Sequence, residues 1–134
     1  MSVRVVLPPA VRRAIVAHTR DAQPAECCGL LLGRGARVAH AIRMANRAAP
    51  PHRYRIDDRA HIALRKILRD IRPPLTIVGV YHSHPRGSLE PSATDRAEAH
   101  YPDWVHVIAG THGRRVRLAA FRIRAGRVRR VAIV

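Results

Sequence analysis

Residues 75–82 of the chain read LTIVGVYH, and residues 83–95 continue as SHPRGSLEPSATD. The first stretch is dense in β-branched side chains, which favour a strand. Pro85 keeps the residue before it out of helical backbone geometry, so the strand is expected to end there. The sequence therefore predicts a strand that ends at two closely spaced histidines, His82 and His84.

Shorter patterns on both sides of this strand predict interspersed helices and strands. Some apolar residues recur at helical spacing, and short apolar runs bounded by Gly and Pro indicate strands. The predicted strands cover residues 3–7, 27–32, 37–44, 54–56, 75–82, 104–109, 115–124 and 127–134. The predicted helices cover residues 10–20, 57–71 and 92–100, and residues 46–53 are expected to form a loop. The chain is therefore expected to be mixed α/β, with residues 1–134 as a single domain.

Length and composition exclude several classes of protein. The chain has 134 residues, of which 47% are hydrophobic, so it is neither disordered nor dependent on a metal or disulfide to fold. It lacks an apolar run of about 18 residues for a membrane span and the pattern of a secretory signal. The adjacent Cys27 and Cys28 are expected to be reduced thiols, because a bridge between neighbours closes almost no loop. We expect a cytoplasmic protein without membrane contact.

The charge is strongly positive. There are 25 Lys and Arg residues against 9 Asp and Glu, a net charge of +16, and the only lysine is Lys66. Such a charge favours acidic partners, either protein or nucleic acid. No acidic residue interrupts residues 114–130, which contain many arginines. Two interpretations stay open: a docking surface, or a solvated strand face that keeps the protein soluble.

Two histidines and an acid form the pattern that carries chemistry. His82 and His84 are two apart on a strand, so both imidazoles point to one side and can converge on one ion. Asp95 follows Ser92 by three positions, and the intervening loop can fold it back beside the histidines. Two histidines and a carboxylate leave a fourth tetrahedral position for water, as catalytic zinc requires. The alternative is a capping box, in which Ser92 and Asp95 only start a helix.

The spacing of these residues resembles the JAMM/MPN+ family of zinc metallopeptidases. The motif of that family has an upstream Glu, then His-Ser/Thr-His, seven residues, Ser, two residues and Asp. The matching residues are His82, Ser83, His84, Ser92 and Asp95, with Glu26 in PAECCGLLLG as the upstream acid. The resemblance extends to Asn46, a Pro-x-x-Tyr-like stretch before Tyr54, and Tyr101-Pro102.

The resemblance implies a fold and a role for each matching residue. The fold is the MPN fold, a central, mixed, curved β-sheet packed by helices in a three-layer arrangement like that of cytidine deaminases. His82, His84 and Asp95 would ligate one zinc ion per chain. Glu26 would hold the zinc-bound water as general base, and Ser92 would donate a hydrogen bond to the developing oxyanion. Zinc lowers the pKa of its water to about 7, so a neighbouring carboxylate suffices as base.

The resemblance also implies a function. Small bacterial and archaeal members, which this chain resembles most, cut after the C-terminal Gly-Gly of ubiquitin-like or sulfur-carrier proteins, or release an adduct such as cysteine. The expected partner is therefore such a carrier tail, and a homodimer is one option for the oligomeric state. The competing hypothesis is a nucleic-acid-binding or DNA-repair-associated MPN module with an arginine-rich surface.

Other residues receive structural interpretations. Trp104 and Phe121 are expected to be core aromatics, and Cys28 a small core residue. His61 and His100 are assigned no role. With one Trp, one Phe and three Tyr, the chain offers few stacking platforms for single-stranded nucleic acid.

Overall fold

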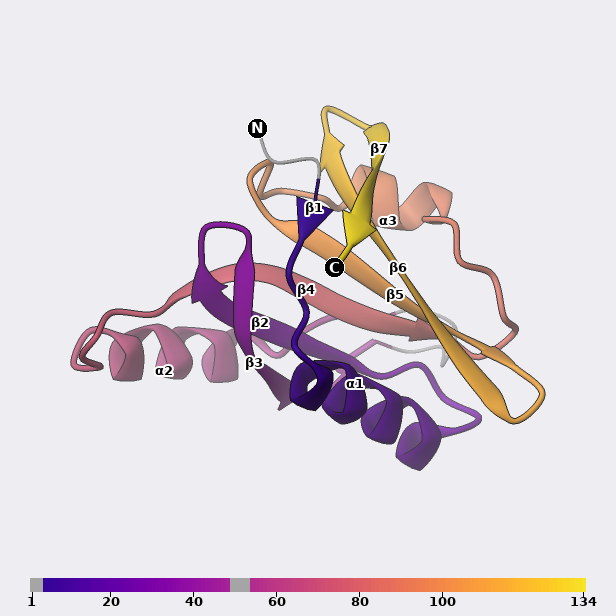
Figure 1. Cartoon of the computed structure of the whole chain (residues 1–134), viewed down its shortest axis with the longest axis horizontal. Coiled ribbons are helices and arrows are strands. Elements are labelled where there is room, and N and C mark those ends of the chain that lie inside the picture. The colour runs from indigo at the N-terminus through magenta and orange to yellow at the C-terminus, as the bar shows by residue number, and fades with distance from the viewer. Residues whose placement is uncertain (1–3, 49–53) are drawn as a thin grey trace.

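A seven-stranded mixed sheet organises the part of the chain that the computed structural model describes, residues 4–48 and 54–134 (Figure 1). The strand order is β1-β7-β6-β5-β4-β2-β3. The strands are β1 (Arg4–Val5), β2 (Cys28–Arg34), β3 (Arg37–Met44), β4 (Thr76–His84), β5 (Val105–His112), β6 (Arg115–Arg124) and β7 (Arg127–Ile133). The helices of the described residues are α1 (Pro9–Ala22), α2 (Asp58–Leu68) and α3 (Ala93–Ala97). None of these helices is long and apolar enough to cross a membrane.

The N-terminal segment joins the two ends of the sheet. β1 pairs in parallel with β7 at one edge. On its other side, the Val6 N–H donates to the carbonyl of Ala36 at 2.8 Å, and the Val6 carbonyl accepts from the Val38 N–H at 3.0 Å. The start of β3 lies at the opposite edge, so the sheet curls until this segment bonds to both edges. Partnered edge groups offer no template for pairing with another chain.

The two longer helices cover opposite faces of the sheet. From α1, Ile15 packs into a core that includes Leu31. From α2, Leu64 packs against Cys28 and Leu30. Leu30 and Leu31 are neighbours on β2 and point to opposite faces, since side chains alternate along a strand. The mixed class, the curved sheet and the three layers are therefore confirmed.

Two predicted elements differ from the structure. Instead of a strand over residues 54–56, there is a single bridge between Ile56 and Asn46, because the Arg55 N–H donates to the Asn46 side chain rather than to a neighbouring strand. The predicted helix over residues 92–100 is the five-residue α3, which has no buried residue to stabilise further turns.

The remaining predicted elements are present with small shifts at their ends. The second helix ends at Leu68 rather than at residue 71, and the first strand contains only two described residues. The central strand extends to His84, as Pro85 led us to expect. Parts of two predictions, the strand over residues 3–7 and the loop over residues 46–53, lie outside the described residues.

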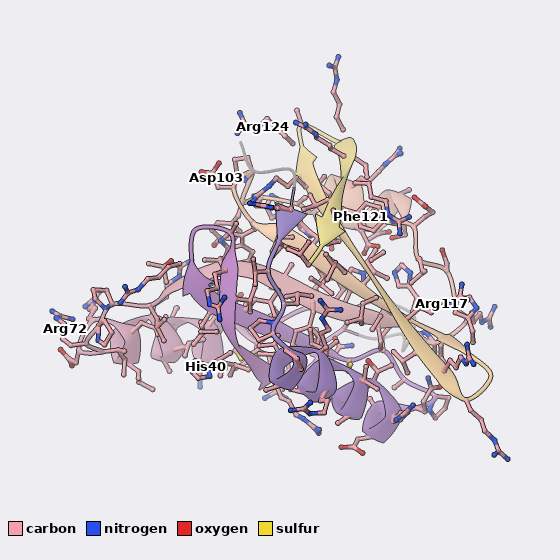
Figure 2. The ribbon with its side chains drawn as sticks, in the orientation of Figure 1. His40, Arg72, Asp103, Arg117, Phe121 and Arg124 are labelled. Atoms are coloured by element: carbon pink, nitrogen blue, oxygen red, sulfur yellow. The ribbon has the colours of Figure 1, made fainter. Side chains whose placement is uncertain are left out.

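The expected core residues hold for Phe121 and Cys28 but only in part for Trp104. Phe121, labelled in Figure 2, and Cys28 are fully buried. One side of Trp104 packs against the core under α2. Its ring also stacks on Tyr101, with ring centroids 3.9 Å apart, and lines a pocket. Trp104 is therefore a pocket wall as well as a core residue.

Candidate metal centre

The end of β4 brings together three side chains that the sequence analysis singled out. The Nε2 atoms of His82 and His84 lie 3.1 Å apart. Oδ2 of Asp95, from the first turn of α3, lies 3.2 Å from Nε2 of His82 and 3.3 Å from Nε2 of His84. Two nitrogen atoms and one oxygen atom thus form a nearly equilateral triangle.

The triangle has the size that a tetrahedral metal ion requires. Ligand atoms about 2.0–2.1 Å from such an ion lie about 3.3–3.4 Å from one another. The side chains are also buried: relative exposure is 1% for His82, 8% for Asp95 and 14% for His84. Imidazole nitrogens and a carboxylate are the donors that zinc prefers when no thiolate is present. The donor set and its spacing therefore fit a zinc-sized cation.

A backbone carbonyl orients the outer histidine. Nδ1 of His84 lies 2.9 Å from the carbonyl oxygen of Ser88. A carbonyl can only accept, so Nδ1 carries the hydrogen and Nε2 of the neutral ring presents a lone pair to the triangle. Metal-binding histidines are commonly held this way through their second nitrogen.

The capping box and the cluster occur together rather than as alternatives. The Asp95 N–H donates to Oγ of Ser92 at 3.0 Å, and the Ser92 N–H donates to Oδ2 of Asp95 at 2.8 Å. The oxygen that caps α3 is the same oxygen that faces the two histidines. The capping box therefore fixes the orientation of the Asp95 carboxylate.

Glu26 reaches the same place from the start of β2. It is 6% exposed, and its carboxylate lies within 4.8 Å of the facing nitrogen atoms of His82 and His84. Ser83 holds the neighbouring backbone through two bonds: Cys27 N–H donates to Ser83 Oγ at 2.9 Å, and Ser83 N–H donates to the Cys27 carbonyl at 3.0 Å. Ser83, between the two histidines, therefore positions Glu26 beside them.

The electrostatics of the cluster favour a bound cation. Burial raises the pKa of Glu26 to about 7, with His84 opposing and Asp95 adding to the rise. Burial also opposes ionisation of Asp95, but the imidazoles of His82 and His84 against its Oδ2 hold its pKa well below the usual range. Burial lowers the pKa of His82, which keeps that ring neutral. An ionised acid and a neutral imidazole are the states that bind metal.

Two supporting residues carried no assigned role in the sequence analysis. The ring of Tyr54 stacks on His82, with centroids 4.2 Å apart and planes 19° apart. Asn46 donates from Nδ2 to the Glu26 carbonyl at 3.1 Å, and its Oδ1 accepts from the Arg55 N–H at 2.9 Å. Asn46 thus links the backbone of Glu26 to the segment that carries Tyr54. Both residues were part of the family resemblance, which was the signal available in the sequence. No sequence pattern indicated the role of the Ser88 carbonyl.

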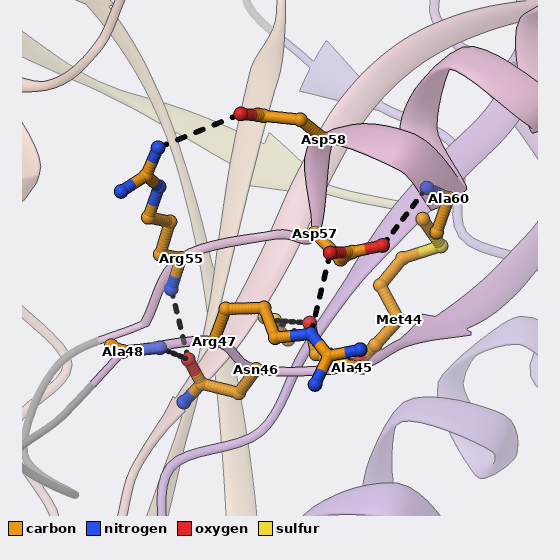
Figure 3. Close-up of polar contacts among 10 residues, drawn as sticks. Met44, Ala45, Asn46, Arg47, Ala48, Arg55, Asp57, Asp58 and Ala60 are labelled. Atoms are coloured by element: carbon orange, nitrogen blue, oxygen red, sulfur yellow. Dashed lines mark hydrogen bonds and ion pairs between the residues drawn. The ribbon is translucent and has the colours of Figure 1, made fainter.

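Further polar contacts hold the Tyr54 segment at the start of α2 (Figure 3). Arg47 contacts Asp57 at 3.3 Å, and Asp57 caps the helix by accepting from the Ala60 N–H at 3.0 Å. Arg55 lies 3.5 Å from Asp58. These contacts hold the segment that carries Tyr54 in place, so that its ring lies over His82 of the cluster.

A pocket of about 400 Å³ opens over the cluster. It is lined by Glu26, His84, Ser92 and Asp95 together with Tyr54 and the loop between β4 and α3. All five residues predicted for the site meet here: four line the pocket, and His82 lies beneath it, buried under Tyr54. The pocket gives a substrate access to the triangle and to the Glu26 carboxylate.

The fold and the cluster define a class: a curled, mixed-sheet domain with two histidines and two acids gathered at the end of its central strand. The chain belongs to the prokaryotic homologues of the JAB domain, whose family model matches residues 8–124.

Curated relatives support the membership. The chain is 34% identical over 122 residues to the desampylase of Haloferax volcanii, covering 84% of this chain and 85% of the relative. It is 34% identical over 118 residues to the CysO-cysteine peptidase of Mycobacterium tuberculosis, covering 86% of this chain and 80% of the relative.

Solved structures share the fold. A protein from Desulfitobacterium hafniense superposes with a TM-score of 0.85 at 27% identity, covering 97% of this chain and 91% of that one. A JAB1/MPN domain protein from Archaeoglobus fulgidus superposes with a TM-score of 0.64 at 18% identity, covering 98% of both chains.

Proposed function

We propose that the chain is a zinc-dependent peptidase or isopeptidase. Its substrate is a ubiquitin-like or sulfur-carrier protein, and it hydrolyses the bond after the C-terminal Gly-Gly or releases an adduct such as cysteine from that tail. The observation that carries the proposal is the triangle of His82, His84 and Asp95 with the buried Glu26 beside it. The two curated relatives, a desampylase and a CysO-cysteine peptidase, support the substrate class.

His82, His84 and Asp95 are the residues that would hold one zinc ion per chain. Zinc bound there would lower the pKa of a water ligand to about 7 and would polarise the scissile carbonyl. Residues of the chain orient the ligands and exclude water. Ser88 and the α3 capping box hold His84 and Asp95 in the orientation that binding requires, and Tyr54 covers His82 against bulk water.

Glu26 acts as the general base in this proposal. It takes a proton from the attacking water and passes it to the leaving amine. A pKa near 7, raised by burial, lets a carboxyl group both accept and donate a proton at neutral pH. Ser92 accepts from the Asp95 N–H, so its own hydroxyl hydrogen can donate to the oxygen of the scissile carbonyl as charge develops there.

The thiols agree with the proposed cytoplasmic location. Cys27 and Cys28 are both free and buried. Burial raises the pKa of Cys28 to about 12, which keeps it protonated and unreactive. Neither thiol takes part in the proposed reaction.

The test measures zinc content and cleavage of a carrier protein extended beyond Gly-Gly. The paired change His82→Ala with His84→Ala removes two ligands and should abolish both. Glu26→Gln should retain about one zinc per chain while losing turnover by about 10²–10⁴-fold, the usual contribution of a positioned base. The control is Asp70→Asn, an exposed acid that does not line this pocket, which should leave both unchanged. Equal zinc content in the wild type and the double variant, or full activity of Glu26→Gln, overturns the proposal.

A further inference from the structure

A second pocket, of about 460 Å³, adjoins the one over the cluster. Tyr54 and Glu98 line both pockets and form the partition between them. The second pocket lies between the start of α2, the segment after α3, and the sheet residues Val80 and His106. The proposed reaction uses none of its inner residues.

Aromatic rings make up much of its wall. Tyr101 and Trp104 stack with planes 10° apart, and His61 approaches both, with centroids 6.3 Å and 6.0 Å away. The guanidinium of Arg65 already lies over the Tyr101 ring, 5.8 Å from its centroid. Ring faces of Trp and Tyr attract organic cations through their negative quadrupole.

Glu98 supplies a carboxylate that no described cation pairs with. Within the described residues, no cation pairs with Glu98, whereas the other acid of this pocket, Asp58, pairs with Arg55. The two adjoining pockets also bring together acidic residues in a chain of net charge +16. Five of the nine acidic residues line them: Glu26, Asp58, Glu90, Asp95 and Glu98.

His106 adds an unpartnered polar group at the sheet side of the pocket. It is 4% exposed, and neither ring nitrogen has a hydrogen-bond partner among the residues that the structure describes. Burial lowers the pKa of His106 to about 4, with His82 adding to the effect and Asp95 opposing it. A neutral imidazole offers one acceptor nitrogen and places no positive charge against a cationic ligand. Buried polar atoms without partners are uncommon and often mark a site that a ligand or water completes.

We propose that this pocket binds an organic cation, the guanidinium or alkylammonium group of an Arg or Lys side chain close to the scissile bond of the protein substrate. Such a group is a donor only and matches the ring faces and the Glu98 carboxylate, and the neutral His106 places no positive charge against it. The substrate assignment rests on the proposed function, because the shared partition puts the pocket within a few residues of the cluster along an extended peptide. The binding of a cation does not depend on that function.

The only tryptophan of the chain, Trp104, reports directly on occupancy. Metal-free protein is titrated with n-butylguanidinium and n-butylammonium chloride, with neutral n-butylurea as the reference at equal ionic strength. We expect a saturable change of tryptophan fluorescence with the cations and none with the urea. The cation that binds with the higher affinity identifies Arg or Lys as the natural source. Glu98→Gln should weaken the cation about tenfold, a loss of about 1.4 kcal/mol. Asp70→Asn, which removes the charge of an exposed acid outside both pockets, should not.

A second experiment uses carrier substrates that have Arg, Lys or norleucine at each position flanking the scissile bond. The proposal expects a lower KM for the cationic residue at one position, and loss of that advantage in Glu98→Gln. The cation site is overturned if the cations and n-butylurea change the fluorescence equally. It is also overturned if the Glu98→Gln variant binds the cations like the wild type. If the titrations saturate while no variant or wild-type sample cleaves any carrier, the proposed function fails and the cation site stands.

Discussion

Tyr54 lies flat on His82 and separates the cluster from the second pocket. An aromatic pair of this kind contributes about 0.5–1.5 kcal/mol beyond the area that it buries. We expect Tyr54→Leu to weaken zinc binding by about threefold to tenfold, because the His82 ring gains freedom. Tyr54→Phe retains the ring and should bind zinc like the wild type. Competition with a chelator measures both, and equal loss in the two variants would assign the effect to the hydroxyl instead.

Proton competition at the two histidines sets the pH range of metal binding. Burial opposes protonation of His84, but the hydrogen bond and the charge of Asp95 raise its pKa above 6.5. Burial lowers the pKa of His82 below 6.5. Zinc binds only neutral imidazole, so the apparent affinity falls as the pH drops through the pKa of each ring, first at His84 and then at His82.

The expected profile follows from that order. The apparent dissociation constant for zinc should rise about tenfold per pH unit once His84 protonates, and more steeply at lower pH where His82 follows. Chelator competition between about pH 8 and about pH 5 measures it. A dissociation constant that stays flat over this range contradicts ligation by histidine.

At the scale of elements, Ser83 ties β4 to the start of β2 by the reciprocal bonds with Cys27. Ser83→Ala leaves the buried Cys27 N–H without its partner, which costs about 1–3 kcal/mol. Denaturant unfolding should show this loss, together with weaker turnover because Glu26 is adjacent. Ser83→Thr keeps the hydroxyl and suits a strand, so it should recover most of the stability. If Ser83→Ala unfolds at the wild-type denaturant concentration, the bond does not hold the two strands.

The arginines of the β6–β7 hairpin alternate between the two faces of the sheet. The strand register, and not the sequence, shows which of them share the face of the cluster. His84, Gly110 and Arg117 lie in register across β4, β5 and β6, so Arg117 shares the face of the cluster. Arg130 pairs with Phe121 on that face, and its guanidinium lies 5.7 Å from the ring centroid. In Figure 2, Arg117 lies toward one end of β6 and Phe121 farther along it.

Four other arginines of the hairpin point the other way. Arg129 pairs with Arg122 and Arg127 pairs with Arg124, positions that alternate with Arg117 and Phe121 along the strand. Adjacent arginines such as Arg129 and Arg130 therefore belong to different surfaces. This separation provides a matched pair of variants for testing the charge.

At the scale of the whole molecule, a net charge of +16 should steer an acidic carrier to the enzyme. Charge reversal of Arg117 and Arg130 to Glu should lower kcat/KM on such a carrier about tenfold at low salt, since both lie on the face of the cluster. The same reversal of Arg127 and Arg129 is the control and should have a much smaller effect. The difference should shrink as the Debye length falls from ~10 Å at 0.1 M to ~3 Å at 1 M salt.

A short neutral peptide with the same scissile bond provides the second control for this prediction. Its turnover should depend little on salt or on either pair of arginines. If carrier and peptide show the same salt profile, the arginines only keep the protein soluble. If the Arg117 and Arg130 variant instead loses saturable, sequence-selective DNA binding, the surface serves nucleic acid.

The sequence by itself determined the elements and most of the site. The β-branched run up to His84, the period of two that aligns the histidines, and the Ser92-to-Asp95 spacing are local patterns, and local patterns follow from backbone geometry. The match to a family motif added Glu26. The largest departures from the predicted extent are at α3, which has no buried residue, and at residues 54–56, where the Arg55 N–H donates to Asn46 rather than to a strand.

The tertiary structure alone decided which distant residues meet. Cys27 and Ser83 are 56 positions apart, and the strand register that joins them is set by which faces are buried and not by any local pattern. The same packing stacks Tyr54 on His82, opens a second pocket beside Trp104, and decides that Arg130 rather than Arg129 shares the face of the cluster. Short-range periodicity carries no information about such contacts, since they depend on how the whole sheet curls and pairs.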